Sequence, residues 1–280
     1  GTLFFGANDG INGPSLWKSD GTETGTVLVK EIEPQSNRDN PTYAILNNQL
    51  IFSALDPVNG LELWITDGTT ANTRLLKDIY PGTGNGNPRG FTLFNNLLYF
   101  QATDPLNGEE LWVTDGTTAG TKLLADINKA TKDANPSNFF KFNNQYLFTA
   151  DDGLHGKELW ITDGTKTGTK LLKDLILGIG SSNPFNFQEQ SGLVFFNFRK
   201  EDGTLQNWQT DGTSAGTIPV PSPFTGTIPP AATSYDLNGI NLSVQDIPAY
   251  GNELFLTPTN GSQIKVQGNG IIISTNTNHP

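Results

Sequence analysis

Acidic side chains recur at fixed intervals along this chain of 280 residues. Three aspartates that each precede Pro or Gly are 48 residues apart: Asp56, Asp104 and Asp152. A second set with the same spacing follows a Leu-Leu run: Asp78, Asp126 and Asp174. Ca²⁺ prefers carboxylate, amide and backbone oxygens, so we expect these six residues to bind a structural or bridging calcium ion. The alternative is that they are solvated turn residues, since no Asp-x-Asp-x-Asp-Gly loop is present.

Few residues in the chain are suited to catalysis. It contains no cysteine and two histidines, His155 and His279, which argues against thiol chemistry, a His-dependent triad and a multi-His metal site. His155 occupies the position of Asn59 and Asn107 in other copies of the repeat, which indicates a turn residue. A glycosidase needs only two carboxylates and remains the main enzymatic alternative. A sialidase-like enzyme would also use arginines, and those expected on the acid-rich side are Arg38, Arg89 and Arg199.

Departures from the repeat indicate a candidate ligand site in the last third of the chain. One ligand needs one environment, so a site on a symmetric scaffold is expected where the copies differ. They differ most over 176–190, 199–207 and 218–230, although gradual decay of the last copies is the alternative explanation. The side chains that we expect to bind a glycan or a protein there are Phe187, Arg199, Phe224 and Tyr235.

Tryptophan spacing defines the repeat that must position these residues. The five tryptophans, 47, 48, 48 and 48 residues apart, are Trp17, Trp64, Trp112, Trp160 and Trp208. A fixed period of this length is typical of repeat proteins, whose units stack on their neighbours. We expect each tryptophan in the core, its indole N–H bonded to the Glu two residues earlier or to a carbonyl group. The Asp-Gly-Thr that follows each of the five predicts a hairpin turn.

Each period contains four short runs of branched and aromatic residues separated by turn residues. In the second unit these runs are 42–46, 50–54, 62–66 and 73–77. Such runs predict a four-stranded antiparallel meander, and no helical periodicity is sustained. A four-stranded sheet repeated every ~40–50 residues is typical of a β-propeller blade.

The number of copies predicts an all-β, six-bladed β-propeller that forms a single domain over residues 1–280. A sixth, degraded copy centres on Phe255, 47 residues after Trp208. The first unit begins at Leu3 and lacks a first strand, which residues 271–274 would supply. We expect this C-terminal strand to close the ring and so remove the open edge. Exchange of the same strand with a neighbouring molecule is the alternative, and would make a polymer.

The repeated phrase Glu-Leu-Trp-x-Thr-Asp-Gly-Thr resembles that of the ELWxxDGT repeat family of bacterial surface or secreted proteins. The stretches that match closely are 62–79, 110–127 and 158–175. The match is good at 16–32, where Ser15 replaces Glu, and weaker at 206–217, where Asn207 replaces Leu. The resemblance covers about the first 217 residues, and it implies no established reaction or catalytic residue.

Composition limits the possible partners. With 28 acidic and 17 basic side chains the net charge is −11, which disfavours nucleic acid. No apolar run approaches the ~18 residues of a membrane span. The chain starts at Gly1 and has no Met, so we expect a processed, secreted part of a longer bacterial product. We therefore expect a non-enzymatic, calcium-assisted binding or assembly module for a glycan or a protein, located at the cell surface or outside the cell.

Overall fold

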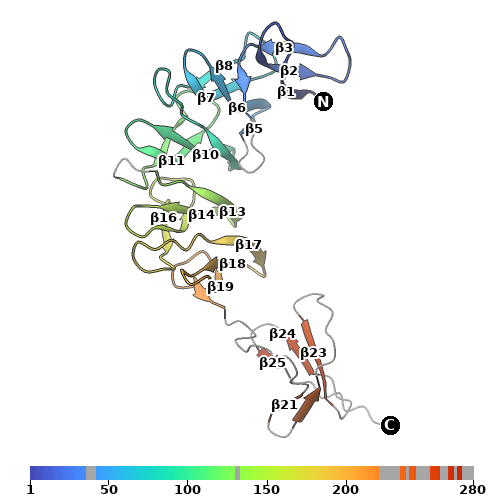
Figure 1. Ribbon diagram of the computed structural model, residues 1–280, viewed down its shortest axis with the longest axis vertical. Helices are drawn as coiled ribbons and strands as arrows, with labels where there is room; N and C mark the ends of the chain where they lie inside the picture. The colour runs from blue at the N-terminus through green and yellow to red at the C-terminus, as the bar shows by residue number, and fades with distance from the viewer. Residues whose placement is uncertain are drawn as a thin grey trace. The chain divides into compact units, whose positions relative to one another are not determined.

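A computed structural model describes residues 1–35, 42–129 and 133–220, together with five strands between 234 and 272. The chain separates into two compact units, Gly1–Pro219 and Val220–Pro280. Every regular element in the described part of the chain is a β-strand, which confirms the all-β prediction (Figure 1). Nothing in that part forms a helix that would reach across a lipid bilayer.

Each repeat of the first unit is an antiparallel meander of short strands, and the sheets follow one another in chain order (Figure 1). The first sheet comprises β1 (Leu3–Asn8), β2 (Pro14–Ser19) and β3 (Val27–Lys30). The second comprises β4 (Glu33–Pro34), β5 (Tyr43–Leu46), β6 (Gln49–Asp56), β7 (Gly60–Thr66) and β8 (Arg74–Lys77). The third comprises β9 (Arg89–Phe94), β10 (Leu97–Asp104), β11 (Gly108–Thr114) and β12 (Lys122–Ala125).

The next two sheets repeat this pattern. The fourth comprises β13 (Ser137–Phe142), β14 (Gln145–Asp151), β15 (Lys157–Thr162) and β16 (Lys170–Lys173). The fifth comprises β17 (Phe185–Gln190), β18 (Leu193–Arg199), β19 (Leu205–Thr210) and β20 (Ile218–Pro219). The predicted four-stranded meander is therefore confirmed for the third, fourth and fifth sheets. The first sheet has three strands because β1 corresponds to the second strand of the later repeats.

Tryptophans pack between neighbouring sheets, as predicted. Trp64 lies in a buried cluster with Leu16 of the preceding repeat, and Trp112 lies in one with Leu63. Trp160 is buried in the same way against the third repeat. Both faces of the central strands are therefore covered, and burial of the large indole ring stabilises each contact between sheets.

The predicted Asp-Gly-Thr turn is also confirmed. Asp67 Oδ1 accepts hydrogen bonds from the backbone N–H of Thr69 at 2.8 Å and from its hydroxyl at 2.7 Å. Gly68 has a φ of 90°, a conformation that glycine adopts without steric cost. Aspartates that bind the following threonine in the same way are Asp20, Asp115, Asp163 and Asp211.

The second unit contains one antiparallel sheet of five strands. Its strands are β21 (Ser234–Leu237), β22 (Ile240–Ser243), β23 (Glu253–Pro258), β24 (Ile264–Gln267) and β25 (Gly270–Ile272). Strand β25 pairs with β24, with Gln267 opposite Gly270. The prediction that residues 271–274 complete the first sheet is not confirmed, because a separation of two residues favours a local hairpin. Six blades and a closed ring remain predictions.

Candidate functional site

The glutamate of each Glu-Leu-Trp phrase binds the loop that leads to the next repeat. Glu62 is fully buried and accepts hydrogen bonds from the backbone N–H of Ile79, Tyr80 and Gly86 at 2.8, 3.1 and 2.8 Å. Glu110 accepts the corresponding bonds from Ile127 and Asn128, both at 2.9 Å. Glu158 does so from Leu175 and Ser182, also at 2.9 Å. We call this arrangement the glutamate clamp.

The clamp corrects the role that the sequence suggested for this glutamate. We expected it to accept the indole N–H of the nearby tryptophan, but its oxygens are occupied by backbone N–H groups of the loop. The indole nitrogens of all five tryptophans are buried, with no hydrogen-bond partner in the described residues. The tryptophans therefore contribute through packing, and the glutamates hold loops.

Each clamp places two carboxyl groups near one another. Burial raises the pKa of Glu62 to about 7; its three N–H donors oppose this rise, and the charge of Asp78 adds to it. Burial likewise raises the pKa of Glu110 to about 7, with Asp126 among the neighbouring charges. The aspartates that follow the fourth strands each have one buried oxygen without a partner among the described residues, and they are Asp78, Asp126 and Asp174.

The first repeat has no glutamate clamp because Ser15 occupies that position. Its short side chain stays within its own hairpin, where the hydroxyl bonds the carbonyl oxygens of Asn12 and Gly13 at 3.2 Å. The described part of the following loop instead forms β4, in which Glu33 pairs with Leu55 of β6.

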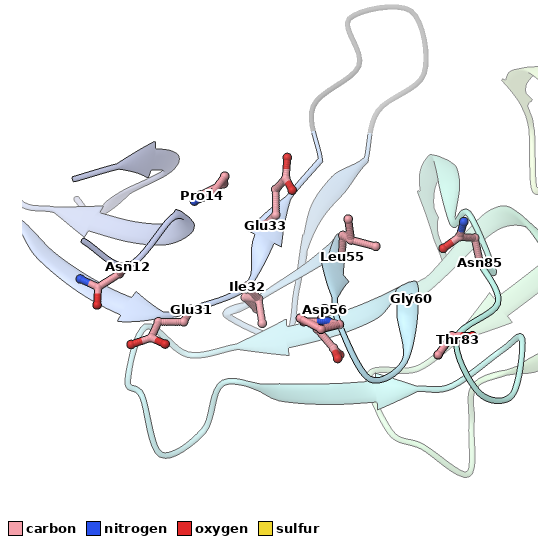
Figure 2. A pocket seen from close by; sticks show the side chains of 11 residues that line it. Asn12, Pro14, Glu31, Ile32, Glu33, Leu55, Asp56, Gly60, Thr83 and Asn85 are labelled. Carbon is pink, nitrogen blue, oxygen red and sulfur yellow. The ribbon is translucent and has the colours of Figure 1, made fainter. Parts of the chain in front are cut away.

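An open groove of about 490 Å³ lies beside this unclamped loop (Figure 2). We call it the Ser15 groove. It is lined by Asn12, Pro14, Glu31, Ile32, Glu33, Leu55, Asp56, Pro57, Gly60, Thr83 and Asn85. These residues belong to the hairpins and the following loops of the first two repeats. The groove thus combines three carboxylates with amide groups and an apolar surface that includes Ile32 and Leu55.

The predicted calcium ligands lie in the expected loops, but the structure does not group them. Asp56 Oδ1 accepts the N–H groups of Val58 and Asn59, and its Oδ2 accepts the Asn59 side chain at 2.8 Å. Burial opposes a fall in the pKa of Asp56, but these hydrogen bonds lower it. Asp104 and Asp152 make similar turns. Within the described ranges, no three His, Asp or Glu side chains are arranged to hold a metal ion, so calcium binding remains a prediction.

His155 is a turn residue, as its position in the repeat indicated. Its Nδ1 lies 2.8 Å from Asp152 Oδ2, where the side-chain nitrogen of Asn59 lies in the second repeat. The hydrogen bond to Asp152 raises the pKa of His155. A role as a general base is therefore not needed to explain this residue.

The predicted ligand-binding residues have different positions in the structure. Phe187 packs between Phe140 and Phe196, with ring centroids 5.8 and 5.6 Å away, so it contributes to the core between two sheets. Arg199 bonds the carbonyl oxygen of Gly203 in its own hairpin at 3.1 Å. Phe224 lies outside the described residues. Tyr235 lies in β21, of which only the backbone is described.

The arginines named for a sialidase-like site have structural partners where they are described. Arg89 forms an ion pair with the buried Glu109, and Arg199 binds its own hairpin. Arg38 lies outside the described residues. Sequence reasoning missed the Ser15 groove, although one signal was visible, namely the loss of the repeated glutamate at Ser15.

Comparison with known proteins gives distant structural similarity. No family model and no curated protein matches the chain. Similar solved structures come from a study of two prolyl endopeptidases, from prolyl oligopeptidase B of Galerina marginata bound to a 35mer substrate, and from puromycin hydrolase. Each is 12% identical over 94% of this chain, with TM-scores of 0.44, 0.43 and 0.42.

These structures are longer proteins. The present chain covers 37%, 36% and 49% of their lengths, less than half in each case. Similarity at this level assigns no activity, substrate or partner to the chain. The likeness to the ELWxxDGT repeat family remains a resemblance of the repeated phrase.

Proposed function

We propose that this chain is a non-enzymatic binding module of the bacterial cell surface or the extracellular space, and that its ligand occupies the Ser15 groove. The observation that carries the proposal is the missing glutamate clamp. In the second, third and fourth repeats the clamp holds the loop against its hairpin. In the first repeat Ser15 leaves the loop unclamped, and acidic side chains line an opening that the packing of the sheets does not explain.

The groove chemistry favours a ligand that carries basic groups. Glu31 and Glu33 are exposed, and within the described residues no hydrogen bond or ion pair engages their carboxylates. Opposite charges attract across a partly desolvated groove, whereas the net charge of −11 repels phosphate groups. Ile32 and Leu55 can contact the aliphatic part of a lysine or arginine side chain. Calcium would extend the range of ligands by bridging these carboxylates to an acidic glycan.

Introducing a glutamate clamp into the first repeat by Ser15→Glu tests the proposal. We expect the new carboxylate of Ser15→Glu to replace the Lys30 carbonyl oxygen as acceptor of the Ile32 N–H, draw the loop inward and close the groove. Ser15→Ala leaves the groove open. Binding of the intact chain to peptide and glycan arrays would be measured with calcium and with chelator. Binding by the wild type and Ser15→Ala, but about tenfold weaker binding by Ser15→Glu, supports the groove. Equal binding by all three contradicts it, and hydrolysis of a bound glycan would identify an enzyme instead.

Strand exchange is a second candidate function, favoured by β1, which within the described strands pairs with β2 alone. The first sheet has three strands, so a strand from another molecule would extend it by backbone hydrogen bonding. Light scattering of the full chain and of a chain lacking residues 270–280 tests this function. Polymers formed only by the full chain would support it, and monomers at every concentration would exclude it.

A further inference from the structure

Four hairpins of the first unit end in an apolar side chain that is almost entirely in solvent. These hairpins join the second and third strands of successive repeats. Their tip residues, with the exposed fraction of each, are Ile11 (87%), Val58 (72%), Leu106 (75%) and Leu154 (69%). We call these four residues the apolar tips.

An aspartate side chain holds the turn beneath each apolar tip. The backbone N–H of Ile11 donates to Asp9 Oδ1 at 2.9 Å, and that of Val58 donates to Asp56 Oδ1 at 2.7 Å. The corresponding distances for Leu106 and Leu154 are 2.8 and 2.9 Å. These bonds preorganise the backbone of the turn, so less conformational entropy is lost when the tip binds a partner.

Nothing in the turn itself requires an apolar side chain at the tip. The turn is held by the aspartate and by the following Asn or His, and the tip side chain contributes little buried area. The fifth repeat shows this directly. Its hairpin aligns with that of the fourth repeat, because Arg199 pairs with Leu205 as Asp151 pairs with Lys157. This alignment places Asp202 at the tip, and the hairpin still forms with this polar residue. Single exposed apolar residues are common, but four at one position of successive hairpins indicate an interaction surface.

Two of the apolar tips, Ile11 and Val58, are next in the chain to residues that line the Ser15 groove. Asn12 and Pro57, the neighbours of Ile11 and Val58 in the chain, both line it. Two exposed apolar side chains therefore lie near a pocket that contains Glu31 and Glu33. A ligand that uses both features needs apolar and basic groups on one face.

We propose that the partner is a basic amphipathic polypeptide segment, whose apolar side chains contact the tips Ile11 and Val58 while a lysine or arginine side chain enters the Ser15 groove. This inference rests on the proposed function and names the class of partner. Charge favours this partner over two other candidates, an anionic membrane and a second copy of the chain. An anionic membrane is repelled by a chain of net charge −11, and a second copy would bring like charges together.

The experiment uses the full chain and a fluorescent peptide of Leu and Lys, about 18 residues long, that forms an amphipathic helix. An all-Lys peptide of the same length and vesicles of phosphatidylglycerol serve as comparison probes. Anisotropy would be measured at about 0.15 M salt for the wild type and for Ile11→Ser with Val58→Ser. The matched control is Leu93→Ser, which removes an apolar side chain that is 51% exposed on β9, away from the hairpins.

We expect the wild type and Leu93→Ser to bind the Leu-Lys peptide equally well. The double variant should bind this peptide about tenfold more weakly. The wild type should bind the all-Lys peptide with a similarly reduced affinity. Equal binding of the peptide by all three proteins would overturn the inference, as would preference for the vesicles. Loss of binding in Ser15→Glu but not in the tip variant would leave the proposed function intact and reject the tips. Binding unchanged in Ser15→Glu would reject the groove itself.

Discussion

At the scale of single residues, the repeated glutamate is the side chain on which the loops depend. Glu62 brings both of its oxygens to backbone N–H groups that lie 17 to 24 residues further along the chain. No pattern of residue types reveals such bonds, because a backbone donor has the same chemistry at every position. The aspartate turns were predictable because they bind backbone groups only two or three residues away.

Replacement of Glu62 by Gln should destabilise the first unit. In Glu62, one oxygen accepts the N–H of Ile79 and the other accepts those of Tyr80 and Gly86. Glutamine replaces one of these oxygens with an NH₂ group, which cannot accept a hydrogen bond. We predict a loss of about 2–4 kcal/mol in the free energy of unfolding, measured by urea denaturation, and a change below about 0.5 kcal/mol for Ser15→Ala. If Glu62→Gln is as stable as the wild type, the clamp does not stabilise the fold.

The raised pKa values of Glu62 and Glu110 determine whether the stability of the fold rises or falls with pH. Each rises from 4.5 to about 7 on folding, so the folded chain binds more protons than the unfolded chain between these values. Stability therefore falls as pH rises through this window, by up to about 3 kcal/mol for each glutamate. The turn aspartates, with lowered pKa values, add stability that is lost only under more acidic conditions.

We therefore predict that the chain is more stable at about pH 5 than at about pH 8. His155 acts in the same direction, because its raised pKa adds stability that is lost as pH rises. The measurement is urea denaturation at both pH values in a His155→Asn background, which reproduces the Asn of the sister repeats. Greater stability at the higher pH would show that these glutamates are ionised in the folded chain.

At the scale of elements, the presence or absence of the clamp decides how each loop is held. The strands and hairpins were predictable from tryptophan spacing and Asp-Gly-Thr turns. Strand β4 was not, because it forms where a clamp is missing. The core position of Phe187 was also missed. Its neighbour Phe196 comes from the paired strand β18, but Phe140 comes from β13 of the preceding sheet, and only the stacking of the two sheets brings it to Phe187.

Exchange of the clamp between repeats should alter the loops in opposite directions. Glu110→Ser removes the acceptor of the Ile127 and Asn128 amides. Ser15→Glu offers a carboxylate to the Ile32 amide, which donates to the Lys30 carbonyl oxygen at 3.0 Å. We predict faster hydrogen exchange at the first pair and slower exchange at Ile32, with little change in the central strands. Unchanged exchange at Ile127 and Asn128 in Glu110→Ser would mean that other contacts hold the loop.

At the scale of the whole molecule, the first unit is a series of stacked meanders with the Ser15 groove between the first two repeats. Composition and period predicted the all-β architecture because they act on every repeat. The proposed ligand site depends on Ser15, which replaces the glutamate of the second, third and fourth repeats, whereas the sequence analysis pointed to the divergent last repeats. Ring closure depends on the partner of the C-terminal strand, and β25 has a local partner in β24.

Hydrogen exchange of the wild-type chain, free and saturated with the Leu-Lys peptide, would show whether the partner binds at the Ser15 groove. We predict slower exchange at amides around Ile11, Ile32 and Val58, and no change at the Asp-Gly-Thr turns. Protection confined to β17–β19 or to the second unit would contradict this prediction and favour a site in the divergent repeats.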